Sequence, residues 1–256
     1  MVDRSNAHIQ RALLNLIGFW RRSGDHDCRA RTMIFVDAVL SQQCRPQTLS
    51  AAVRSALGKP LRRAAALTQL ALVGALACIP VERRHLPSAL LWQSTSGPRQ
   101  ETLTLLDEVC NGHSEPLPYD FLATQPAVAA ARIQPFLPGL QSAAYFPLDT
   151  EGDAHWSLLI ALASNWLEEG RYAQVLCAHL DTWAESTTGH WLALAGAPLA
   201  SSQATLQLRT MTIPGALADT PGFPEHLASW LKQASTPALV LESPRARRLA
   251  VEFTRI

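Results

Sequence analysis

The chain has 256 residues, of which 48% are hydrophobic and 17% charged, so it can bury a sizeable core and is not a disordered protein. Its formal net charge of +1 excludes the strongly basic surface that a nucleic-acid-binding protein presents. The five cysteines are an odd number without a Cys-x-x-Cys pair, so a reducing cytoplasm is expected rather than a disulfide framework.

The first 57 residues are expected to form a helical N-terminal part, whose place in the fold the sequence leaves open. Within this part, His8–Arg22 carries its apolar side chains on a broad helical stripe, which predicts an amphipathic helix. Met33–Leu40 is partly β-branched and aromatic, so it is either a strand or an extended linker. Pro46–Leu57 is expected to be a second helix.

A long apolar helix is expected over Leu61–Ile79, after a break at Gly58-Lys59-Pro60. Its most apolar part, Leu67–Ile79, is too short to span a bilayer, which takes ~20 residues. The sequence therefore predicts a buried helix here and no membrane span.

The central region begins with a strand and a helix. Ser88–Gln93 is predicted to be a short buried strand, and Arg99–Cys110 the helix that follows it. Pro116–Tyr119 is expected to be a loop, and Gln125–Phe136 a further helix.

Strands and helices continue to alternate through the rest of the chain. Gln141–Phe146 and Gln174–Leu180 are predicted strands on either side of Ser157–Glu169, a helix that is apolar nearly all round and is therefore buried on all sides. The remaining elements expected are strands at Trp191–Ala195, Thr205–Ile213, Ala238–Glu242 and Leu249–Phe253, and a helix at Pro224–Ala234. This alternation predicts a layered α/β sheet, and without an obvious linker or internal repeat it predicts a single domain over residues 1–256.

Residues 116–181 connect the sequence with a known family. Leu117–Ala127 echoes the segment Ser-Pro-x-x-Phe-x-x-Ser-Val-His-Asn, but Pro126 and Ala127 stand where that segment has histidine and asparagine. In the order and spacing of its elements, the stretch from Leu61 to Ile213 resembles the N-terminal half of β-ketoacyl synthases, which are condensing enzymes of the thiolase fold.

The resemblance implies an α/β, thiolase-like layered fold that corresponds to about one half of a ketosynthase subunit. In the spacing that the resemblance implies, Asp153 or a neighbour stands where the family has its nucleophilic cysteine, at the start of the long buried helix that Gly170 ends. A carboxylate cannot carry an acyl group as a cysteine thioester does. The family's histidines come from the C-terminal half, and the chain is expected to end where that half begins. Condensing activity by this chain alone is therefore not expected.

Small ketosynthase-like proteins of this kind are described as chain-length-factor-like, and they occur beside full ketosynthases in clusters that make aryl polyenes. The resemblance implies a non-catalytic subunit of a type II β-ketoacyl synthase in fatty acid, polyketide or aryl polyene biosynthesis. Its partner would be a full-length ketosynthase in a heterodimer, and acyl carrier protein would bind the complex. By family position, the candidate tunnel or interface residues are Thr124, Phe146, Gly152, Asp153, His155 and Trp156.

The segment Cys177-Ala178-His179-Leu180-Asp181 supports a different hypothesis, because it places cysteine, histidine and aspartate on one face of a strand. A zinc site or a nucleophile–base pair has this composition, but no second element with ligand spacing is evident, so a buried cysteine beside a hydrogen-bonded histidine explains the pattern better. The alternative function is an independent enzyme acting on acyl thioesters, a thioesterase or an acyltransferase, whose nucleophile is Cys177 or a serine that the sequence does not single out. A second alternative is a structural homodimer or scaffold. No Gly-x-Ser-x-Gly, Walker, Rossmann or His-Glu-x-x-His motif occurs, so neither a cofactor nor a metal is predicted.

Overall fold

The computed structural model describes residues 33–61, 64–112, 115–126, 128–150, 152, 154–183, 185–209, 216–233, 236–243 and 249–256. The chain divides into two compact units, Met1–Thr32 and Met33–Ile256, and all described residues belong to the second. The helix expected over His8–Arg22 therefore lies outside the described residues. Among the residues described, no helix is long and apolar enough to cross a membrane.

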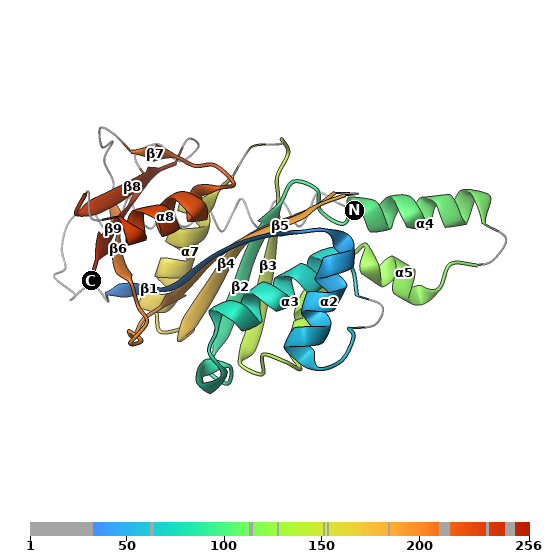
Figure 1. Ribbon diagram of the computed structural model, residues 1–256, viewed down its shortest axis with the longest axis horizontal. Helices are drawn as coiled ribbons and strands as arrows, with labels where there is room; N and C mark the ends of the chain where they lie inside the picture. Colours follow the sequence, from blue (N-terminus) through green and yellow to red (C-terminus); the bar gives the residue numbers. More distant parts are fainter. Residues whose placement is uncertain are drawn as a thin grey trace. The chain divides into compact units, whose positions relative to one another are not determined.

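A sheet of nine strands runs through the described unit, in the order β3-β2-β4-β5-β1-β6-β9-β8-β7 (Figure 1). Its first five strands are β1 (Ile34–Cys44), β2 (Ser88–Ser94), β3 (Leu140–Pro147), β4 (Gln174–Thr182) and β5 (Thr187–Ala195). Strands β3, β2 and β4 are parallel to one another, whereas β5 is antiparallel to both of its neighbours, β4 and β1. Met33–Leu40, which the sequence assigns either to a strand or to a linker, thus belongs to a central strand.

Helices α2 (Pro46–Leu57), α3 (Ala66–Cys78) and α6 (Val128–Ile133) cover one face of these five strands. Figure 1 shows α2 and α3 side by side over this face. Leu49, Leu70 and Ile133, one from each helix, are at most 1% exposed and share a core cluster with residues of the sheet. The predicted buried helix at Leu61–Ile79 is confirmed, and it starts at Ala66.

Helix α7 (Trp156–Glu168) lies against the opposite face, where the sequence predicts a helix buried all round. Trp156, Leu159 and Ile160 are at most 2% exposed and belong to a second core cluster. That cluster also contains residues of α8 (Phe223–Lys232) and of strands further along the chain. The described chain itself therefore buries α7 on several sides.

The strands that follow repeat the pairing of the first five in a shortened form. They are β6 (Ala204–Arg209), β7 (Leu217–Ala218), β8 (Ala238–Glu242) and β9 (Ala250–Arg255). In the run β1-β5-β4-β2 two antiparallel pairings are followed by a parallel one, and the run β6-β9-β8-β7 has the same succession. A helix precedes the third strand of each run, α7 before β4 and α8 before β8, and β1 joins the two runs by pairing with β6.

The described unit thus holds a first set of strands, β1 to β5, and a shorter second set, β6 to β9, with the same succession of pairings. The sequence indicates no repeat, because the two sets have the same order of strand pairings but no recognisable sequence similarity. The outer face of the second set is polar: Thr205 pairs with Thr254, and Gln207 pairs with Glu252. These four side chains are half-buried or exposed, so this face is compatible with direct contact to water.

Two short elements differ from the sequence-based expectations. Pro116–Tyr119, expected as a loop, overlaps helix α5 (Pro118–Ala123), which begins with a proline in its first turn and an Asp120 carboxylate that accepts a hydrogen bond from the Leu117 N–H. Helix α6 is shorter than the predicted Gln125–Phe136. Helix α4 (Arg99–Asn111) agrees with its prediction to within one residue.

Replacing Gly74 with alanine is expected to lower the free energy of unfolding by about 2 kcal/mol, because overpacking a tight core costs roughly 1–3 kcal/mol. A Cβ on Gly74 of α3 would lie 2.0 Å from the Trp191 ring, which is fully buried. Alanine has a higher helix propensity than glycine by about 1 kcal/mol. The expected loss of stability is therefore what remains after the clash with Trp191 has outweighed this stabilising effect. Urea unfolding measures the loss, and Gly196→Ala, with open space around its Cβ, is the matched control. An equal or higher stability of Gly74→Ala would contradict this packing.

Candidate functional site

A row of polar side chains crosses the first set of strands at one register, near the amino end of α7. Gln93 pairs with His179, His179 with His190, and His190 with Ser41, while Phe146 pairs with Gln93 on the edge side. Gln93, His179 and His190 are 0%, 2% and 5% exposed. Polar groups this deeply buried cost several kcal/mol unless they are hydrogen-bonded, so their partners define what the row does.

Gln93 fixes the start of α7. Its side-chain oxygen accepts a hydrogen bond of 2.8 Å from the backbone N–H of His155, the residue that precedes the helix. The His155 ring donates from Nδ1 to the carbonyl oxygen of Ala154 at 2.7 Å. The helix start is thus held by a side chain from β2, a strand some sixty residues earlier in the chain.

Asp219, which directly follows β7 in the second set, occupies the amino end of α7. Its two carboxylate oxygens accept the backbone N–H groups of Trp156 and Ser157, each at 2.9 Å, and also the Ser157 hydroxyl at 2.6 Å. The indole N–H of Trp156 donates to the carbonyl oxygen of Pro221 in the same connection. Burial raises the pKa of Asp219 from its ordinary value, against the opposing effect of these hydrogen bonds. The free N–H groups that begin α7 are therefore bound by a carboxylate of the same chain.

His179 and Asp181 form a hydrogen-bonded pair at the carboxyl end of β4. The His179 Nε2–H donates to one Asp181 oxygen at 2.9 Å, and the other oxygen accepts the N–H groups of Thr95 and Ser96 and the Ser94 hydroxyl. Burial alone would raise the pKa of Asp181, but the hydrogen bonds from His179, Ser96 and Ser94 outweigh it and lower the pKa to about 2. The carboxylate thus locks the turn that leads from β2 into α4.

His190 lies at the other end of the row, against β1 and α8. Its Nδ1 is hydrogen-bonded to the Ser41 hydroxyl at 2.9 Å and lies 3.9 Å from the Glu225 carboxylate. Burial lowers the pKa of His190, so the ring is neutral at pH 7. The row thus links β2 to the start of α7 through Gln93 and β5 to β1 through His190, while Gln93 Nε2 and His179 Nδ1 have no hydrogen-bond partner among the described residues.

The stability of the protein is expected to depend on Asp181 in the acid range. Its folded-state pKa of about 2 lies below the ordinary 3.8, so its contribution is present above about pH 4 and is lost as the pH falls towards 2. We expect the stability difference between the native protein and Asp181→Asn to shrink by about 2 kcal/mol over that range. Urea unfolding at several pH values measures it, and a difference independent of pH would contradict this assignment.

The structure brings three of the six predicted site residues to this end of the sheet. Phe146 lies on edge strand β3 next to Gln93, His155 precedes α7, and Trp156 begins it, its ring centre 6.5 Å from that of His179. Gly152 is an exposed residue with a positive φ of 89°. Thr124 ends helix α5, where its hydroxyl donates to the Phe121 carbonyl oxygen, and Asp153 lies outside the described residues.

Cys177 belongs to the apolar core and not to a reactive site. Its side chain is 0% exposed, and burial raises the pKa of its thiol. A thiol of this kind is a poor nucleophile and a poor metal ligand, because both roles need the thiolate. Among the residues that the structure describes, no group of three or more His, Cys, Asp or Glu side chains is placed to hold a metal ion. Of the Cys-x-His-x-Asp pattern, only the His179–Asp181 pair forms.

Sequence reasoning missed Gln93, His190 and Asp219. The register that aligns Gln93 with His179 and His190 depends on strands brought together only in the folded chain. Asp219 binds α7 from 62 and 63 residues away in the sequence. No local motif marks any of the three.

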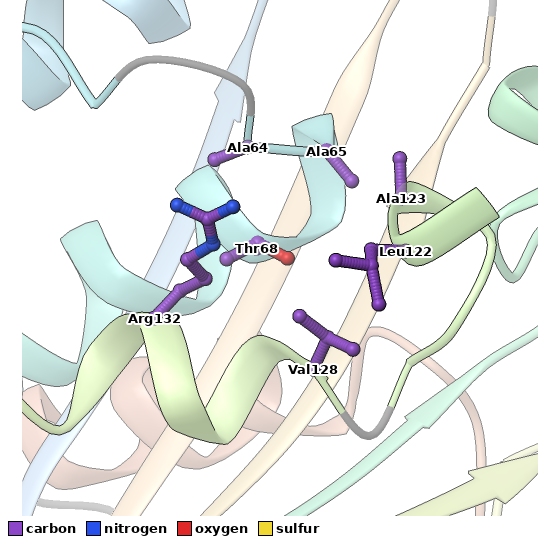
Figure 2. Close-up of a pocket in the computed structure, with 7 residues that line it drawn as sticks. All are labelled: Ala64, Ala65, Thr68, Leu122, Ala123, Val128 and Arg132. Atoms are coloured by element: carbon purple, nitrogen blue, oxygen red, sulfur yellow. The ribbon is translucent and has the colours of Figure 1, made fainter. Parts of the chain in front are cut away.

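A small pocket lies outside the polar row (Figure 2). It has a volume of about 10 Å³, room for about one water molecule, and lies between the start of α3, α5 and α6. Its lining residues are Ala64, Ala65, Thr68, Leu122, Ala123, Val128 and Arg132. Ligand pockets usually measure ~300–1,000 Å³, so this one is too small for a long acyl chain.

No protein-family model and no curated protein matches the sequence. Solved structures of similar fold include the following three. A ketosynthase in complex with its chain length factor from Xenorhabdus doucetiae matches with a TM-score of 0.51 and 14% identity, over 86% of this chain and 99% of that one. The ishigamide ketosynthase/chain length factor matches with a TM-score of 0.57 and 10% identity, over 87% and 99%. A type II polyketide synthase acyl carrier protein in complex with its ketosynthase matches with a TM-score of 0.57 and 12% identity, over 88% and 100%.

At these identities the comparisons define the fold. The described chain has the thiolase-like α/β fold of ketosynthases and chain length factors, as the resemblance implies.

Proposed function

We propose that this chain is a non-catalytic, chain-length-factor-like subunit that pairs with a full catalytic ketosynthase in a type II fatty acid, polyketide or aryl polyene pathway. The fold supports this assignment, because two of the similar structures are of ketosynthases with their chain length factors. In the complex, the partner supplies the cysteine and the histidines, and this chain stabilises the partner and helps to shape the tunnel that limits product length.

The proposal that the chain is non-catalytic rests on the amino end of α7, where the backbone N–H groups are already hydrogen-bonded by Asp219. A condensing enzyme uses a thiolate at such a helix end, where the helix dipole and free N–H groups lower its pKa. Here the first N–H groups are bound by the Asp219 carboxylate, and the sequence from Asp149 to Ser157 contains no cysteine. A second negative charge, such as a thiolate, would be repelled from that position.

The pairing part is supported by the open edge of the sheet at β3. Within the described sheet, β3 is an end strand that pairs with β2 alone. Its sequence Leu-Gln-Ser-Ala-Ala-Tyr-Phe-Pro has no charged residue, and the side chains of residues 142–146 are half-buried. Edge strands that face water usually carry charges or are covered, so an uncharged edge of this length suits pairing with a strand of another subunit.

The candidate residues Phe146, His155 and Trp156 belong to this proposal as positions near the tunnel, together with Gly152 and Asp153. Thr124 belongs to the proposed interface. Acyl carrier protein docks on the complex, chiefly on the catalytic subunit. One similar structure is of a ketosynthase with its acyl carrier protein, which supports this view of the assembly.

Reconstitution of condensation tests the proposed function. The ketosynthase encoded nearest to this chain is assayed with acyl carrier protein, alone and together with this chain, and the products are analysed by mass spectrometry. We expect condensation or a defined product length only when both are present. Replacing the ketosynthase cysteine should abolish it, whereas Cys177→Ala in this chain, which removes the thiol without burying a new polar group, should leave it unchanged.

Thioesterase or acyltransferase activity of this chain alone would contradict the proposal and favour an independent enzyme. A stable homodimer that does not bind ketosynthases would favour the alternative of a structural homodimer or scaffold.

A further inference from the structure

Helices α4 and α5 form a hairpin with an exposed apolar surface. Leu103, Leu106 and Val109 recur on α4 at a spacing of three residues, and each is more than half exposed. On α5, Phe121 is 51% and Leu122 46% exposed. Three exposed apolar side chains in a row on one helix, with two more on the neighbouring helix, mark a contact with another molecule.

The hairpin also carries a strong local charge. Between Arg99 and Ala123 the sequence has one arginine and five carboxylates, which are Glu101, Asp107, Glu108, Glu115 and Asp120. The whole chain, by contrast, has a net charge of +1. One of these carboxylates, Glu101, accepts the backbone N–H of Ala66 at 3.0 Å and so faces the start of α3. The surface that covers the rest of the hairpin is therefore expected to combine an apolar centre with basic side chains around it.

The position of the hairpin relates it to the open sheet edge. Helices α4 and α5 lie in the connection between β2 and β3, the two outermost strands on that side of the sheet. Figure 1 shows α4 and α5 side by side beyond the end of the strands. After α5 the chain enters α6, which packs against β3. A subunit that pairs with β3 thus approaches the side of the sheet from which the hairpin extends.

We propose that the α4–α5 hairpin is an arm that clasps the same ketosynthase subunit that pairs with β3, on an apolar surface bordered by arginine or lysine. This inference rests on the proposed function and adds a second, separable part to the interface. The arm increases the contact area beyond what one pair of edge strands provides, so it acts mainly on the lifetime of the complex.

The double variant Leu103→Gln/Leu106→Gln tests the arm, because glutamine keeps the helix and removes the apolar surface. We expect its Kd for the ketosynthase to rise at least tenfold because the complex dissociates faster. Surface plasmon resonance measures both the Kd and the dissociation rate. Thr104→Gln, an exposed position of the same helix, is the matched control and should change Kd less than twofold. Added salt should slow association of the native pair, because opposite charges steer it.

The outcomes separate the arm from the proposed function. If the native pair binds and the double variant binds equally well, the arm is not part of the interface, while the proposed function stands. If the native chain does not bind the ketosynthase at all, the proposed function itself fails. If the chain alone forms a homodimer that the double variant dissociates, the hairpin binds a second copy and the inference is overturned.

Discussion

Replacing Asp219 with alanine is expected to lower the free energy of unfolding by about 3 kcal/mol. The change leaves two buried N–H groups and the Ser157 hydroxyl without the acceptor that binds them, and each buried unsatisfied group costs roughly 1–3 kcal/mol. It also removes the carboxylate that complements the positive end of the α7 dipole. Urea unfolding followed by far-UV circular dichroism measures the loss.

Two further variants make this result specific. Asp219→Asn keeps one carbonyl oxygen at the same place, so about half of the loss is expected. Asp120→Ala removes a carboxylate that caps the short, more exposed helix α5, and it should cost less than about 1 kcal/mol. A change below about 1 kcal/mol for Asp219→Ala would mean that Asp219 does not hold the start of α7. The main support for a non-catalytic chain would then be lost.

Replacing Ala144 with lysine is expected to weaken binding to the ketosynthase more than a hundredfold. Ala144 lies in the middle of the edge strand β3 and is half-buried, and natural sheets use a lysine at such places to prevent edge-to-edge pairing. Ala144 packs against the core cluster around α7 but is only half-buried, so a lysine stem can lie along that apolar surface with its ammonium in water, and the monomer itself should stay folded. Size-exclusion chromatography with light scattering measures the complex, and circular dichroism checks the fold.

The matched control is Thr205→Lys, which places the same charge on the polar outer face of β6. It should leave the complex intact. If Ala144→Lys and Thr205→Lys both bind the ketosynthase like the native chain, β3 is not the pairing edge, and the partner has to dock elsewhere on this chain.

The sequence predicts best those helices and strands whose own local pattern of residues determines their secondary structure. The helices α3 and α7 and the strand β4 are long apolar runs with clear breaks, so local pattern and burial agree. Helix α5 was missed because it is only six residues long and depends on a proline and on the Asp120 cap. The sequence does not reveal the second set of strands as a repeat of the first. The two sets have the same order of strand pairings, but their amino-acid sequences show no internal repeat.

The site shows the same division. The order of elements points to the start of α7, and Phe146, His155 and Trp156 do lie at that end of the sheet. What closes the helix end is Asp219, and what supports it is Gln93. Both contacts join residues more than sixty positions apart, so they follow only from the folded chain.

The most direct test of the central claim is native mass spectrometry of this chain co-expressed and co-purified with the ketosynthase encoded nearest to it. Our account predicts a 1:1 complex of the two chains, with β3 and the α4–α5 hairpin protected from hydrogen exchange relative to the isolated chain. A chain that purifies alone as a folded species and shows no complex with that ketosynthase would contradict the account.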